Sequence, residues 1–187
     1  MTNHEKIVDA LSEMVRCTCK DTIANGQNSI DLRENQLAAK GRLDKVTIIN
    51  IPTPFAVYHP DLSRPELCPF LEVGIPQKAC DAIIITEHSS KTHMIICELK
   101  CGSKQGVIDQ LKNTAAICDF LISLVEQHKE LDCANIVKRY VVIGARTLKK
   151  KKTRQTDLKA GSSPKRPREL SVKNKAQIYL KELCLPY

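Results

Sequence analysis

Apolar residues near the start of the chain recur at intervals of three and four. Between residues 5 and 16 they include Ile7, Val8 and Leu11. This spacing puts them on one face of a helix and predicts an amphipathic α-helix. The polar stretch 21–29 that follows predicts a loop.

The next part of the chain predicts a helix and then a strand. Residues 31–40 are rich in helix-forming residues and are followed by Gly41, which predicts a second short helix carrying Glu34. The β-branched run 45–51 predicts the first strand. The proline-rich residues 52–79 predict an irregular connection.

The middle of the chain alternates between apolar strands and a long helical pattern. Two apolar strands, 81–86 and 93–100, flank the polar residues 87–92 and predict an antiparallel hairpin. Helical spacing over 105–127 predicts the longest helix, and 139–144 predicts a further buried strand. This order predicts an α/β fold with a mixed central sheet flanked by helices.

The register of this hairpin brings three polar residues together. If the turn is centred between Ser89 and Ser90, Asp81 lies opposite Glu98. Because side chains alternate along a strand, Lys100 shares a face with Glu98. Two carboxylates in an apolar hairpin repel each other and lose hydration, a cost that a bound divalent cation would offset. Oxygen ligands favour Mg²⁺ or Mn²⁺, which would activate water for phosphodiester hydrolysis while Lys100 steadies the charge.

These residues resemble a known catalytic signature. Cys80-Asp81, sixteen intervening residues and then Glu98-Leu99-Lys100 resemble the motif of the PD-(D/E)xK, or restriction-endonuclease-like, nuclease superfamily. In that family the Asp opens the second core strand and the Glu-x-Lys closes the third. The resemblance implies a restriction-endonuclease-like core, with Asp81 and Glu98 as metal ligands and Lys100 as a catalytic group.

The resemblance implies two more site residues and covers about residues 29–145. A Glu on a preceding helix often adds to the metal site in this family, which points to Glu34 as a further ligand, with Glu13 as the substitute. Gln110 resembles a polar position on the helix after the Glu-x-Lys strand. Cys80 stands where the name-giving proline would be.

The charge of the chain is concentrated in one stretch. The formal net charge is +8, and residues 146–175 carry twelve Lys and Arg against two acidic residues. Such a stretch favours a polyanion partner, because neutralising phosphates releases counterions. We therefore expect nucleic acid, DNA before RNA, to be bound here, and the candidate contacts are Lys149, Lys150, Lys151, Lys152, Arg154, Lys165, Arg166 and Arg168.

The domain organisation follows from the same patterns. We expect a nuclease-like domain over 1–145, a flexible basic segment over 146–175 and a C-terminal strand or helix over 176–187 that packs on the core. Apolar runs are too short to span a membrane, and the start of the chain has no secretory pattern. We expect a cytoplasmic protein, nucleoid-associated in a prokaryote or nuclear in a eukaryote.

The sequence therefore predicts a Mg²⁺- or Mn²⁺-dependent nuclease acting in restriction, defence or repair. The alternative is a catalytically silent nucleic-acid-binding or scaffolding protein with the same fold. A third reading, a redox- or zinc-responsive module built on the nine cysteines, has no paired Cys-x-x-Cys spacing to support it. A homodimer and an activating protein partner both stay open.

Overall fold

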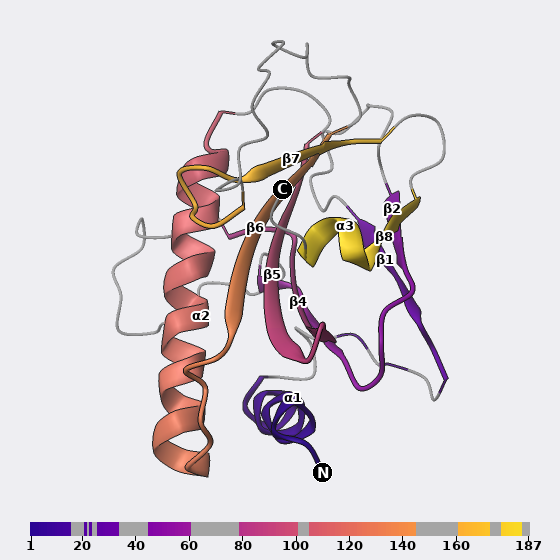
Figure 1. Ribbon diagram of the computed structural model, residues 1–187. Helices are drawn as coiled ribbons and strands as arrows, with labels where there is room; N and C mark the ends of the chain where they lie inside the picture. The colour runs from indigo at the N-terminus through magenta and orange to yellow at the C-terminus, as the bar shows by residue number, and fades with distance from the viewer. Residues whose placement is uncertain are drawn as a thin grey trace.

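The fold is an α/β arrangement built on two mixed β-sheets (Figure 1). The computed structural model describes residues 1–15, 21, 23, 26–33, 45–60, 79–100, 105–144, 161–172 and 177–184. None of the helices in these residues is long and apolar enough to cross a membrane. The expected α/β class with a mixed central sheet is confirmed.

The larger sheet has five strands in the order β3-β4-β5-β6-β7. Its strands are β3 (Ala56–Tyr58), β4 (Ala82–His88), β5 (Lys91–Lys100), β6 (Val137–Gly144) and β7 (Arg168–Ser171). The first three form an antiparallel meander, and β6 and β7 follow parallel to β5. The long helix α2 (Val107–Lys129) makes the crossover from β5 to β6 that a parallel pair requires.

A two-residue turn fixes the register of the central hairpin. Ser89 and Ser90 both have positive φ, 51° and 59°, and this left-handed pair matches the right-handed twist of the strands that it joins. His88 therefore pairs with Lys91, and the ladder continues to the pair Ala82 and Cys97. The predicted centre of the hairpin is confirmed, and the strands extend closer to the turn than the sequence suggested.

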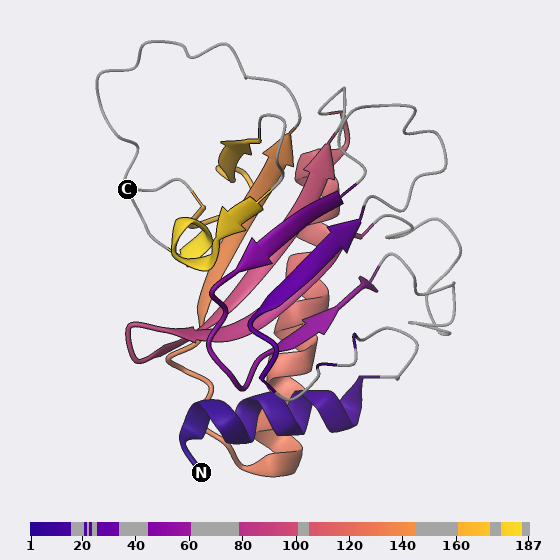
Figure 2. The same cartoon turned by 90° about the vertical axis from the view of Figure 1, so that its right-hand side faces the viewer.

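The smaller sheet lies against one face of the larger one (Figure 2). It contains β1 (Ser29–Arg33), β2 (Lys45–Ile49) and β8 (Gln177–Tyr179), in that order, and the short helix α3 (Leu180–Cys184) follows β8. An apolar cluster joins Ile48 of this sheet and Leu183 of α3 to Ile84 and Ile95 of the larger sheet.

The opposite face of the larger sheet is covered by α2 and by α1 (Asn3–Met14). A second cluster joins Leu11 of α1 and Leu111 of α2 to Ile83 and Ile96. Neighbouring residues of β4 and β5 thus enter different clusters, because side chains alternate across a strand. Both faces of the central strands are buried, which explains their continuous apolar runs.

Three expectations from the sequence differ from the structure. A helix over 31–40 is wrong for its first residues, since β1 is a strand whose Ile30 and Leu32 are buried alternately with exposed neighbours. The irregular connection 52–79 contains the strand β3, whose three residues are all buried. The basic segment 146–175 is not flexible throughout, because β7 extends the sheet beside β6.

Candidate functional site

The hairpin register places two acidic residues across from each other at one end of the larger sheet. The ladder pairs Ala82 with Cys97, so the next position along it sets Asp81 opposite Glu98. Asp81 stands two residues before Ile83, and Glu98 stands two residues after Ile96. Because side chains alternate along a strand, both carboxylates share the face of Ile83 and Ile96, which α2 covers. The convergence predicted from the sequence is therefore confirmed at the level of strand register.

Both carboxylates are buried and bonded. Asp81 is 5% exposed, and its Oδ2 accepts a hydrogen bond from the Leu99 backbone N–H at 2.7 Å. Glu98 is 1% exposed, and its Oε1 lies 2.6 Å from Nζ of Lys100. The Lys100 side chain is itself only 11% exposed. Three ionisable residues thus lie at one end of the hairpin with little exposure to water, and charges there interact more strongly than in water.

The first turns of α2 hold the backbone that leads into Asp81. Gln110 is buried, and its Nε2 donates to the Ala79 carbonyl oxygen at 3.2 Å. Thr114, one turn later, accepts a hydrogen bond on its Oγ1 from the Cys80 backbone N–H at 2.8 Å. The structure therefore places Gln110 beside the site, as a partner of the main chain just before Asp81.

The contact with Thr114 uses the backbone N–H of Cys80. Proline has no backbone N–H, so it could not make the hydrogen bond that Cys80 makes. The Cys80 thiol is buried, and burial, together with the negative charge of Glu98, raises its pKa. Burial and the nearby Asp81 also raise the pKa of the Cys97 thiol. A raised pKa favours the thiol over the nucleophilic thiolate at both cysteines.

Glu13, the substitute for Glu34 as a further ligand, does not join this cluster. Glu34 lies outside the described residues. Glu13 pairs with Lys129 at the C-terminal end of α2, and Figure 1 shows α1 near that end. Lys129 is about 28 Å along the helix axis from Gln110, at 1.5 Å per residue. Within the described residues no group of three His, Cys, Asp or Glu side chains is gathered for a metal ion.

The basic residues proposed for nucleic acid divide into three groups. Lys149 to Lys152 and Arg154 lie outside the described residues. Lys165 and Arg166 are exposed on a turn in which the Arg166 N–H donates to the Ser163 carbonyl. Arg168 is 4% exposed and pairs with Val141 in the sheet, so its side chain does not face solvent as a surface phosphate contact would.

His59 lies near Asp81, although no motif or spacing in the sequence singles it out. It follows β3, and its Nδ1 lies 2.9 Å from the Asp81 carbonyl oxygen. Because β3 falls in the proline-rich stretch, the pairing of β3 with β4 was not foreseen, and that pairing is what brings His59 to the site. Recognition of β3 as a strand paired with β4 would have indicated that His59 lies near Asp81.

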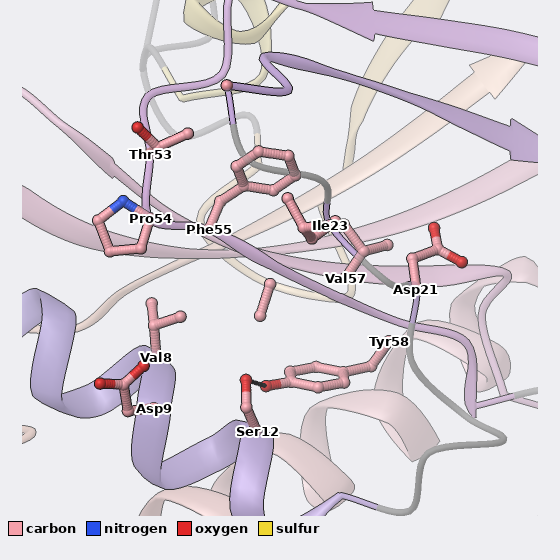
Figure 3. A pocket seen from close by; sticks show the side chains of 12 residues that line it. Val8, Asp9, Ser12, Asp21, Ile23, Thr53, Pro54, Phe55, Val57 and Tyr58 are labelled. Atoms are coloured by element: carbon pink, nitrogen blue, oxygen red, sulfur yellow. Dashed lines mark hydrogen bonds between the residues drawn. The ribbon is translucent and has the colours of Figure 1, made fainter.

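A separate pocket of about 400 Å³ lies between α1 and β3 (Figure 3). Its wall includes Val8, Asp9 and Ser12 of α1 together with Tyr58. The Ser12 Oγ lies 3.4 Å from the Tyr58 hydroxyl, which joins the helix to the strand. The pocket lining does not include Asp81, Glu98 or Lys100, so it is distinct from the carboxylate cluster.

Comparison with known proteins found no matching family model, no similar curated protein and no similar solved structure.

Proposed function

We propose that this protein is a metal-dependent nuclease that hydrolyses phosphodiester bonds, with Asp81, Glu98 and Lys100 as its active residues. One observation carries the proposal: two buried carboxylates lie opposite each other on one face of a hairpin, with a largely but not fully buried lysine beside them. A strand end that only faced solvent would leave these charges exposed and weakly interacting. Their burial favours a functional cluster.

The chain path supports the same proposal. Asp81 directly precedes the second strand of the five-stranded sheet, and Glu98 and Lys100 end the third. A crossover helix and a parallel strand then follow. This is the position that the PD-(D/E)xK resemblance assigns to the Asp and to the Glu-x-Lys, and a restriction-endonuclease-like core remains part of the proposal.

The donor set fits a hard divalent cation. Mg²⁺ is commonly held by one or two carboxylates, with waters and substrate phosphates completing its octahedron, so Asp81 and Glu98 suffice as protein ligands. When bound, Mg²⁺ or Mn²⁺ supplies Lewis-acid chemistry that polarises the phosphodiester and makes water more acidic. In this proposal Lys100, which contacts Glu98, orients the attacking water and stabilises negative charge on the phosphate.

Sequence and topology together favour nucleic acid as the substrate. Lys100 pairs with Gly144 at the end of β6, and the run of four lysines begins five residues after Gly144. Five residues span at most about 17 Å, so this basic run starts within reach of the carboxylate cluster. We propose that it holds the phosphate backbone of DNA, and that the enzyme acts in restriction, defence or repair.

The test is cleavage of supercoiled plasmid, linear duplex, single-stranded DNA and RNA in Mg²⁺ or Mn²⁺. Asp81→Asn is the sharpest variant, because the remaining amide oxygen can still accept from Leu99 while the ligand charge is lost. Glu98→Gln and Lys100→Met complete the set, and Asp9→Asn on the exposed face of α1 is the matched control. Metal-dependent cutting that Asp81→Asn abolishes and Asp9→Asn retains would establish the nuclease.

One observation favours a second candidate, a nucleic-acid-binding protein that does not cut. Asp81 and Glu98 each already have an internal partner, and the described residues provide no third ligand beside them. In that case Lys100 and Glu98 form a structural ion pair. Binding of the same substrates without cleavage in either metal, unchanged in Asp81→Asn, would favour this candidate.

A further inference from the structure

His59 links three parts of the chain around Asp81. Its side chain is 11% exposed and lies just past the end of β3. One ring nitrogen, Nδ1, is 2.9 Å from the Asp81 carbonyl oxygen, and the other, Nε2, is 3.1 Å from Oδ1 of Asp21. A carbonyl oxygen only accepts, so Nδ1–H is the donor to Asp81.

The pairing of β3 with β4 ends two residues before it would reach Asp81. β3 pairs with β4 up to Tyr58 and Ile83, and if this register continued, Pro60 would stand opposite Asp81. Proline has no N–H and cannot extend the ladder to the Asp81 carbonyl. The His59 ring reaches that carbonyl from the neighbouring position, at the point where strand pairing ends.

Asp21 in turn fixes the ring of His59. The Asp21 backbone N–H donates to the Val57 carbonyl at 3.0 Å, so this residue is held alongside β3. Figure 3 shows Asp21 beside Val57 at the edge of the pocket between α1 and β3. Its carboxylate lies beside Nε2, and when Nε2 also carries a proton it donates to Oδ1, which limits rotation of the imidazole about its side-chain bonds.

We propose that His59 is a positioning residue, whose ring holds the main chain of Asp81 so that its carboxylate stays aimed into the site. The inference rests on the proposed metal-dependent function. Asp81 is then held at two points: its carbonyl by His59 and its Oδ2 by the Leu99 N–H. Ligating groups must be fixed to within about 0.5 Å for full function, and supporting hydrogen bonds change metal affinity by about 10- to 100-fold.

Two substitutions separate the contacts of His59. In His59→Asn the side-chain amide nitrogen stands as many bonds from Cα as Nδ1 does, so it can still donate to Asp81. In His59→Gln the amide nitrogen corresponds to Nε2, so it can meet Asp21 but not the Asp81 carbonyl. His128→Asn, on the exposed C-terminal turn of α2, is the matched control.

The experiment measures Mn²⁺ affinity directly, by the electron paramagnetic resonance of free Mn²⁺, alongside the Mn²⁺ concentration for half-maximal cleavage and the melting temperature. We expect His59→Gln to weaken Mn²⁺ binding about 10- to 100-fold. We expect His59→Asn to stay within a few-fold of wild type, and cleavage by His59→Gln to recover at saturating Mn²⁺. A merely structural role would instead lower the melting temperature and leave metal affinity unchanged.

The outcomes are distinguishable. Equal Mn²⁺ affinity in wild type and His59→Gln would overturn the positioning role, as would an equal loss in His59→Asn and His59→Gln. If wild type itself neither bound Mn²⁺ nor cut nucleic acid, the proposed function would fail and the role of His59 with it. Mn²⁺ binding and cleavage by the wild-type protein thus show whether the proposed function fails or only the positioning role of His59.

Discussion

Removing one partner of the ion pair between Glu98 and Lys100 should lower the stability of the metal-free protein by a large and measurable amount. At a separation of 2.6 Å, two unit charges attract by about 6 kcal/mol at an effective dielectric constant near 20, before desolvation is subtracted. Lys100→Met leaves the carboxylate of Glu98, 1% exposed, without this ammonium partner. Breaking such a buried pair from one side costs about 3–5 kcal/mol, so we expect a loss of that order.

Removing both charges should lower the free energy of unfolding by much less than the sum of the losses in the two single variants. Glu98→Gln leaves only Lys100, whose longer side chain can turn toward solvent, so we expect a loss of about 1–2 kcal/mol. In the double variant no charge is left buried at these positions, and the coupling energy should be about 2 kcal/mol or more.

Urea unfolding at pH 7 with a chelator present measures this double-mutant cycle. The exposed pair of Asp109 and Lys112, 3.4 Å apart on α2, provides the control cycle, for which we expect a coupling below about 0.5 kcal/mol. Additivity of the Glu98 and Lys100 changes to within about 0.5 kcal/mol would refute the reasoning, since the two charges would then not depend on each other.

Three further predictions concern other parts of the fold. Cys80→Pro removes the N–H that binds Thr114 and should lower the free energy of unfolding by about 1–3 kcal/mol in urea; unchanged stability would contradict this. Burial, followed by the charge of Arg139, lowers the pKa of His93 to about 4. The folded state therefore binds fewer protons there than the unfolded chain, and stability should fall by at most about 3 kcal/mol from pH 6.5 to pH 4, a dependence that His93→Gln should flatten in acid denaturation. Replacing the four lysines 149–152 by alanine should weaken DNA binding and reduce the slope of log affinity against log salt by up to about 4; an unchanged slope would exclude phosphate contacts from these residues.

The hairpin and the carboxylate pair could be predicted because their determinants are local. The turn at Ser89 and Ser90 sets a register that carries along both strands, and alternation then decides which side chains share a face. The long helix α2 was predictable from its apolar spacing alone. Burial of Glu98 followed from the apolar strands around it.

The parts that could not be predicted depend on pairing between distant segments. β1 alternates buried and exposed residues as a strand should, but the helix formers that follow it dominated the local pattern. β3 is three residues long between prolines, and β7 lies in a basic stretch, so composition concealed both. His59 reaches Asp81 only through the pairing of β3 with β4, which no local signal shows.

The short edges of the larger sheet constrain how two copies of the protein could associate. β3 and β7 are its outer strands, with three and four residues, and Asp21 already donates its N–H to the Val57 carbonyl. Growth of a sheet by strand addition relies on a long row of open backbone groups, and this row is short at both of these edges. A dimer that cut both strands of a duplex would therefore gain little from strand addition at these two edges of the larger sheet, and we expect it to assemble through other surfaces.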